Sequence, residues 1–409
     1  MTAPTMTSPP RSFAALREPR FRLFFVGVAS VMMADAIEHV ISYWVMFQKF
    51  HSPTLAGFAI VSHWLPFLLF SVYSGAAADR YDPRRIIQIG MALFMAASIA
   101  WGVLFFTDTL QMWHAAVLLI VHGCAGATWG PSVQVLIHHI VEPRTLPSAV
   151  RLIATARWAG LMLGPALGAP LLLLLGPTYG ILVNALIYLP FLVWVRTIPF
   201  SRKAAPPPLR GFGDVAAATR VVAGNRVLLS MTLLAGCASL LVGNAYHAQL
   251  PEFARDFGHI AADVTYSMLF AADALGALTA GLVLESRGLL PPRARSAFVL
   301  AILWCLAIGS FALSASYPLA LALLFAAGFL ELSFYAMAQT LVQLHAPPEM
   351  RGRVIGVFTM SAMGLRAFSG VTVGVGGSLI GIHWSLAISA GVLFALLAFG
   401  FALATRWRS

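Results

Sequence analysis

The sequence predicts an all-α polytopic membrane protein, with twelve transmembrane helices in two pseudo-symmetric six-helix bundles. Three observations lead to this fold class. Hydrophobic residues make up 59 % of the 409 residues and charged residues only 10 %, whereas a soluble chain averages about 25 % charged residues. Apolar runs of helix length recur along the whole chain, and basic residues gather on alternate sides of them. A soluble enzyme, a nucleic-acid binder and a disordered protein are thereby excluded.

The apolar runs are each long enough to cross a bilayer core of about 30 Å. We expect helices, because an open strand or a coil would leave polar backbone groups unpaired in lipid. The twelve runs cover residues 21–48, 55–78, 86–107, 113–137, 148–175, 179–197, 226–250, 262–284, 296–315, 318–343, 354–380 and 383–405.

The longest polar interruption divides the runs into six and six. It contains a basic stretch and three consecutive prolines, so we expect a linker, with a short surface helix after Asp214. The expected organisation is a cytoplasmic tail over 1–20, a first bundle over 21–197, the linker over 198–225, a second bundle over 226–405 and a cytoplasmic tail over 406–409.

Charge predicts the orientation. If the N-terminus lies inside and the runs alternate in direction, the inner segments hold 22 of the 26 Lys and Arg residues. The outer segments hold Lys49 and Arg255, and two arginines fall within runs. Because cytoplasmic loops carry the excess of Lys and Arg, we expect both termini in the cytoplasm of a multi-pass plasma (inner) membrane protein.

The two halves repeat a short pattern. Gly75 and Asp79 follow the second run, and Gly281 and Glu285 follow the eighth run at an offset of 206 residues. The fifth and eleventh runs each carry one arginine. Parallel six-helix halves of this kind are typical of one large transporter fold.

The loop after the second run resembles the signature loop of the major facilitator superfamily, through Gly75, Asp79, Arg80, Arg84 and Arg85. The fifth run is similar to the antiporter motif of the drug-efflux branch, through Gly160, Gly164, Pro165 and Gly168. The segment 348–354 resembles exporters of the enterobactin and macrolide branch. The resemblance implies the major facilitator fold, with alternating access through a central cavity and a helix-packing role for the fifth-run motif.

The signature loop predicts a cytoplasmic gate. We expect Asp79 near the N-terminus of the eleventh helix, where the helix dipole favours an anion. Arg351 and Arg353 lie at that same end, and Glu142 is a natural partner for one of the loop arginines, which are Arg80, Arg84 and Arg85. Such pairs would latch the two halves together. The alternative is that these are ordinary charges of inner loops.

Ionisable residues inside the membrane are expensive and usually face a cavity or a partner. Six such residues fall within the runs, namely Asp35, Glu38, Arg157, Asp273, Glu331 and Arg366. The first two share one helix face with His39. A carboxyl group in a poorly solvated cavity can bind and release protons near neutral pH, so we interpret the four acids and His39 as proton-coupling residues. The alternative is a fixed ion pair, for example between Asp35 and Arg157.

Arg157 and Arg366 either hold an anionic substrate or neutralise a buried acid. We expect His63, His122 and His247 to be packing residues, although each could join a proton relay. A divalent metal site built from Asp35, His39, Cys237 and His247 is the weaker alternative, because no spacing within one helix supports it. The sequence therefore predicts neither a metal nor a cofactor.

The leading functional hypothesis is proton-coupled efflux of small amphipathic organic compounds, drug-like or siderophore-like. One alternative is a proton-coupled importer of an organic anion, and a remote alternative is a non-transporting membrane scaffold. No nucleophile–base pair and no zinc-binding helix motif indicates an enzyme. The expected partners are a small-molecule substrate, protons and the lipid bilayer, with no nucleic acid, for a chain that works as a monomer.

Overall fold

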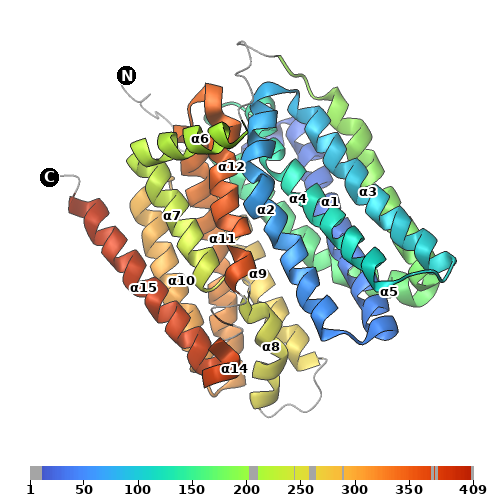
Figure 1. Ribbon diagram of the computed structural model, residues 1–409. Helices are drawn as coiled ribbons and strands as arrows, with labels where there is room; N and C mark the ends of the chain where they lie inside the picture. Colours follow the sequence, from blue (N-terminus) through green and yellow to red (C-terminus); the bar gives the residue numbers. More distant parts are fainter. Residues whose placement is uncertain are drawn as a thin grey trace.

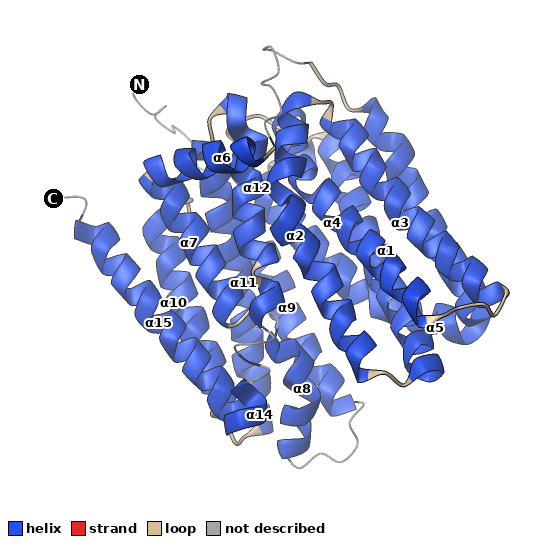
Figure 2. Cartoon of the chain, in the orientation of Figure 1, coloured by secondary structure: helices blue, strands red, loops and turns tan. Residues whose placement is uncertain are grey.

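The computed structural model describes residues 12–201, 211–243, 245–257, 264–287, 290–369, 373 and 376–406. Across these residues all regular secondary structure is helical (Figure 2), and the helices form two bundles side by side (Figure 1). The predicted fold class is therefore confirmed. Parts of the predicted tails and linker, namely 1–11, 202–210 and 407–409, lie outside the described residues.

The first bundle contains α1 (Pro19–Phe50), α2 (Pro53–Arg80), α3 (Pro83–Phe106), α4 (Met112–Ile140) and α5 (Leu146–Trp194). The last of these carries two membrane crossings, because the chain turns sharply at Gly176, with φ 73° and ψ 171°. A residue with a side chain rarely adopts a positive φ, and Pro177 follows directly. The glycine thus ends one crossing and starts the next without a loop.

The second bundle contains α7 (Arg226–Leu241), α8 (Ala245–Asp256), α9 (Val264–Arg287), α10 (Ala294–Ala312), α11 (Tyr317–His345), α12 (Arg351–Thr359), α13 (Arg366–Ser369), α14 (Gly376–Ile380) and α15 (Ile382–Arg406). Two crossings are broken, whereas the sequence predicted continuous helices. The break after α7 includes Gly243 at φ 49°, and a π-helical turn over Met360–Gly364 separates α12 from α13. Such π turns occur frequently at functional sites.

Nine of the described helices are each long and apolar enough to cross a membrane. The three other predicted crossings are the second crossing of α5, the broken pair of α7 and α8, and the broken pair of α12 and α13. A short helix, α6 (Phe212–Gly224), precedes α7 and bends away from it by 109°. It lies across the end of the molecule where α1 begins and α15 ends (Figure 1), and we call this end the terminal face.

Candidate functional site

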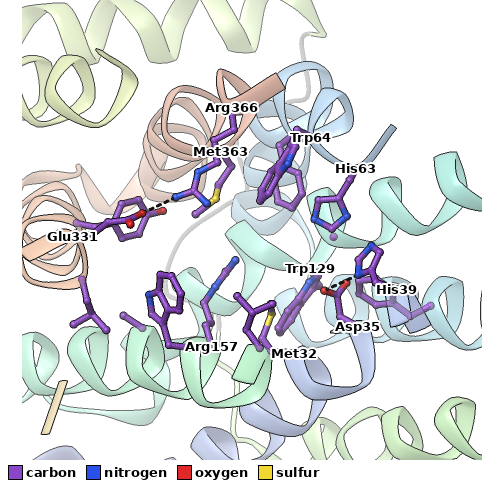
Figure 3. A pocket seen from close by; sticks show the side chains of 18 residues that line it. Met32, Asp35, His39, His63, Trp64, Trp129, Arg157, Glu331, Met363 and Arg366 are labelled. Carbon is purple, nitrogen blue, oxygen red and sulfur yellow. Dashed lines mark hydrogen bonds and ion pairs between the residues drawn. The ribbon is translucent and has the colours of Figure 1, made fainter. Parts of the chain in front are cut away.

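A cavity of about 200 Å³ lies between the bundles, and both contribute to its wall. In Figure 3, Asp35, His39 and His63 lie on one side of it, Glu331 and Arg366 lie on the other, and Arg157 projects between them. Two of the predicted coupling acids are absent from this wall. Glu38 and Asp273 are 2 % and 1 % exposed and lie in the protein interior.

In the first bundle, one imidazole bridges two carboxylates. His122 on α4 places Nε2 at 2.7 Å from Oδ1 of Asp35 and Nδ1 at 2.8 Å from Oε1 of Glu38. The two acids are three residues apart on α1, so both reach the same side of the helix. Behind them, Ser98 donates a hydrogen bond to Glu38, and Asn184 lies at 3.4 Å from Ser98.

The two contacts of His122 fix the number of protons in this cluster. A neutral imidazole has one N–H, and an ionised carboxylate only accepts. Both hydrogen bonds therefore need either a doubly protonated His122 or a proton on one carboxyl group. In both cases the cluster holds one proton more than two carboxylates and a neutral imidazole would hold. Asp35, Glu38 and His122 together therefore carry a net charge of about −1.

Two further histidines adjoin the cluster. His39 Nδ1 lies 3.7 Å from Oδ2 of Asp35, and the His63 ring centroid lies 5.0 Å from that of His39. Within the described chain, the buried Nδ1 of His63 has no hydrogen-bond partner. From the sequence, His63 and His122 were expected to be packing residues, because neither has a partner at helical spacing on α2 or α4. Only the fold brings them to α1.

The second bundle holds a separate group of ionisable residues. Asp273 on α9 pairs with His247 Nε2 at 3.0 Å and accepts a hydrogen bond from the Tyr246 hydroxyl at 3.3 Å. The two partners are on α8, directly after the break. The alternative metal set is not assembled, since the cluster of possible ligands found among the described residues contains neither Cys237 nor His247.

The two intramembrane arginines have different surroundings. Arg366 lies 3.4 Å from Oε1 of Glu331 and stacks over the Trp64 ring at 5.2 Å. It thus connects the two bundles across the cavity. Arg157 lines the cavity, and no hydrogen bond or ion pair holds its guanidinium to another part of the chain that the structure describes. The alternative expected from the sequence, a fixed ion pair between Asp35 and Arg157, is not what the structure shows. Asp35 pairs with His122 instead.

The end of α2 meets the first turn of α12 at the terminal face. The carboxylate of Asp79 accepts the backbone N–H groups of Gly352 and Arg353 at 2.6 and 3.0 Å, where the helix dipole favours an anion. The Arg353 side chain adds an ion pair at 3.3 Å and reaches Asp214 on α6 at 2.9 Å. The close approach needs Gly75, because an added Cβ would overlap the carbonyl oxygen of Gly352.

A second link joins α9 to α5 at the same face. Ser148 donates a hydrogen bond to Glu285, and Arg151 forms an ion pair with Glu285 at 2.8 Å. A Cβ at Gly281 would overlap the Thr155 side chain. The side chains of Gln134 and Gln343 add a hydrogen bond of 2.6 Å between the bundles. These contacts between the bundles all lie on the side of the cavity nearer the terminal face.

The remaining residues of the predicted gate have other surroundings. Arg84 pairs with Asp82 at 2.6 Å and donates to the carbonyl oxygen of Ile198, instead of reaching Glu142, which is exposed. Burial alone would raise the pKa of Asp82, but the hydrogen bonds from Arg84 outweigh it and hold that pKa below its usual value. The other three predicted gate arginines are Arg80, which lies over the Tyr81 ring at 5.8 Å, Arg85, which is exposed, and the half-buried Arg351.

The predicted packing motif lies against α1. Gly160, Gly164 and Gly168 form a stripe on α5, and a Cβ added at the first would meet the backbone of α1 at Ala29. Small residues at this spacing let two helices approach closely. Pro165 lies within the helix, where it removes one backbone hydrogen bond. The stripe therefore packs two helices of the same bundle.

Comparisons with known proteins agree with this architecture. The family model of the Major Facilitator Superfamily matches residues 23–370. The crystal structure of the human organic anion transporter MFSD10 (TETRAN) has a TM-score of 0.73 at 17 % identity and covers 94 % of this chain and 99 % of its own. The proton:xylose symporter XylE has a TM-score of 0.75 at 14 % identity and covers 96 % of each chain. At these identities the likeness is one of fold.

A shorter match exists to a curated plant protein. The probable peptide/nitrate transporter At3g43790 of Arabidopsis thaliana is 28 % identical over 158 residues, which is 37 % of this chain. The match spans 31 % of the length of that relative.

Proposed function

Because this chain belongs to the major facilitator superfamily of membrane transporters, we propose that it is a proton-coupled exporter of small amphipathic organic compounds, drug-like or siderophore-like, that works by alternating access. Transporters of this family bind small molecules, often with proton coupling. We infer export, not import, because segment 348–354 resembles exporters.

One observation carries the proton coupling, namely the pair of hydrogen bonds that joins His122 to Asp35 and Glu38. These contacts need a shared proton. Asp35 also lies at the cavity wall, so the proton can exchange with the cavity. A substrate that binds beside Asp35 favours its charged form when the substrate is cationic, and the proton then leaves. Competition between substrate and proton is the physical requirement for antiport.

The contacts between the bundles support alternating access. The links of Asp79 and Glu285 hold the bundles together on the terminal-face side of the cavity. Release of both links is the change that would expose the cavity to that face. From the distribution of Lys and Arg, we place the terminal face in the cytoplasm and the protein in the plasma (inner) membrane as a monomer.

The cavity wall fits an amphipathic compound with a planar apolar part. Trp64, Trp129, Trp158 and Tyr335 contribute to it, and aromatic rings stack on planar groups and cations. Carboxylates and guanidinium groups supply the polar contacts.

A second candidate is import of an organic anion, coupled to protons. The guanidinium of Arg157 favours it, because it lines the cavity without an ion-pair partner in the described part of the chain. The likeness to the organic anion transporter MFSD10 adds support at the level of fold.

Reconstitution into liposomes tests both candidates. The purified protein is inserted into vesicles that hold a pH-sensitive dye, a pH gradient is imposed, and amphipathic cations and organic anions are added in turn. We expect proton movement on addition of an amphipathic compound, and its loss in Asp35→Asn. Asp108→Asn is the matched control, because Asp108 is an exposed loop residue paired with Lys49 at 2.6 Å.

Equal proton movement in Asp35→Asn and the wild type contradicts the coupling role. A response to anions alone, abolished by Arg157→Gln, replaces the exporter with the anion importer. Vesicles sorted by orientation give the direction of transport.

A further inference from the structure

Three imidazoles that no short sequence spacing connects meet beside the cavity. His39 on α1, His63 on α2 and His122 on α4 each offer one ring nitrogen, and these three atoms lie within 4.8 Å of one another. The His39 ring centroid is 4.7 Å from that of His122 and 5.0 Å from that of His63. The Asp35 carboxylate approaches two of the rings, at 2.7 Å from His122 and 3.7 Å from His39.

We propose that these residues form a binding site for one divalent transition-metal ion of the Zn²⁺, Co²⁺ and Ni²⁺ group. The ligands are His39, His63 and His122, with Asp35 as the fourth. Imidazole nitrogen suits these metals, and three nitrogens with one carboxylate oxygen complete a four-coordinate site. Zinc–nitrogen bonds of about 2.0–2.1 Å place tetrahedral ligand atoms about 3.4 Å apart. The three nitrogens lie within 4.8 Å of one another, so rotation of the rings must bring them closer by up to about 1.4 Å to bind one ion.

Glu38 supplies the support that a metal-binding histidine needs. A ligating imidazole usually donates its other N–H to a carboxylate, which fixes the tautomer and the ring orientation. Glu38 lies 2.8 Å from Nδ1 of His122, which leaves Nε2 for the metal. Ser98 donates in turn to Glu38, so the supporting carboxylate is itself held in place.

The hydrogen bonds of the described residues do not account for the position of the His63 side chain. Its Nδ1 is buried and lacks a hydrogen-bond partner among the described residues, although its ring faces His39 and His122. His63 also lines the cavity, which gives an ion a path to it. Metal coordination accounts for an imidazole held in this position.

Charge and protons balance when the metal binds. The cluster of Asp35, Glu38 and His122 carries about −1 with its shared proton. Coordination through Nε2 of His122 and the Asp35 carboxylate releases that proton, so the two carboxylates balance a divalent ion. The metal ion and the proton therefore compete for one site. Only this competition rests on the proposed proton coupling; the metal site itself does not.

Other ionisable side chains surround the site. The Tyr43 ring centroid lies 5.0 Å from that of His39, and Tyr188 stacks on Phe94, which packs against His122. On α5, Arg157 lines the same cavity as His39 and His63, so its charge repels a metal ion bound there. Replacing Arg157 with a neutral side chain should therefore tighten metal binding, whereas the same change should weaken binding of an anion.

The test is a titration of the purified, tag-free protein with Co²⁺, followed by Zn²⁺ competition. We expect one equivalent of Co²⁺ to give the visible absorption of a four-coordinate ion, with about one proton released per metal. His63→Gln should weaken binding by more than about tenfold, and Arg157→Gln should strengthen it. His345→Gln is the matched control, because His345 is exposed at the end of α11.

Size-exclusion profiles and thermal unfolding show that each variant is folded. Two results would overturn the metal site. In one, Co²⁺ keeps the weak colour of its aqueous form when it is added to the wild type; in the other, the wild type and His63→Gln bind Co²⁺ with equal affinity. Asp35-dependent proton movement with organic compounds tests the transport proposal separately, so failure of one proposal leaves the other standing.

Discussion

The carboxylate of Asp79 accepts the backbone N–H of Gly352 at 2.6 Å and joins the second crossing of the first bundle to the fifth crossing of the second. Glu285, which follows Asp79 at the repeat offset, makes the converse link from α9 to α5. Two carboxylates separated by the offset of the sequence repeat thus each join the two bundles at the terminal face. Because each ends a helix that carries a close-packed glycine, the links depend on backbone contact as well as on charge.

Asp79→Asn should slow transport without affecting membrane insertion. Asparagine keeps one acceptor oxygen but loses the negative charge at the N-terminus of α12 and the pair with Arg353, so the closed state loses about 1–2 kcal/mol, roughly tenfold in population. The measurement is the transport rate in vesicles with matched protein content. A wild-type rate in Asp79→Asn, with Asp108→Asn as the control, rules out the latch.

Gly75→Ala should open the terminal face by steric means alone. The added methyl group would overlap the backbone of Gly352, and backbone cannot move aside as a flexible side chain can. We expect faster labelling of a cysteine introduced at this interface. Gly391→Ala is the matched control, since nothing lies within 4 Å of its added Cβ. If both variants label alike, the contact between α2 and α12 does not hold the face closed.

The sequence predicts the fold well because lipid imposes simple rules. Apolar run length predicts the crossings, and the density of Lys and Arg between runs supports their number. The breaks were missed for a local reason. Gly243 looks like any glycine in an apolar run. The sequence does not show that it adopts a positive φ, or that an added Cβ there would overlap the Ser239 carbonyl oxygen of α7 and the Ser369 side chain.

The site is harder to predict than the fold. Asp35, Glu38 and His39 share a helix face, which spacing alone reveals. The position of His122 between the two acids depends on how α4 is rotated against α1, and 84 or more residues separate the partners. The partner of Arg151, Glu285, is 134 residues away. Apolar patterns specify which face is buried but not which polar groups meet.

Asp82 should stabilise α3 in a pH-dependent manner. Its carboxylate accepts the backbone N–H of Arg84, and its pKa is lower than usual, since hydrogen bonds from Arg84 outweigh its burial. A lowered folded-state pKa adds stability above the unfolded pKa of about 3.9, and this is lost as the pH falls through the folded value. Asp82→Ala should cost about 1 kcal/mol at pH 7.

The check is thermal unfolding in detergent, compared between pH 7 and about pH 3. The loss caused by Asp82→Ala should shrink at low pH. Asn225→Ala removes the matching cap of α7, which accepts from Val227 at 3.0 Å, and asparagine does not titrate, so its cost should be constant. A cost for Asp82→Ala that is independent of pH would disprove the role of its charge.

Arg151 and Glu285 should be strongly coupled, because Glu285 is only 1 % exposed. Arg151→Ala leaves a buried carboxylate with Ser148 as a neutral partner, which costs about 3–5 kcal/mol. The cost falls on the closed state, since opening the terminal face hydrates Glu285. The closed population should therefore drop by more than about a hundredfold.

A double-mutant cycle measures this coupling. In a background without the native cysteines, Thr155→Cys reports access by its labelling rate, because Thr155 packs against Gly281. We expect faster labelling in Arg151→Ala and a rate closer to the parent when Glu285→Ala is added, since no unpaired charge then remains. Arg84→Ala is the control, because its bonds stay within the first bundle. Strictly additive effects of Arg151→Ala and Glu285→Ala would show that the ion pair does not close the face.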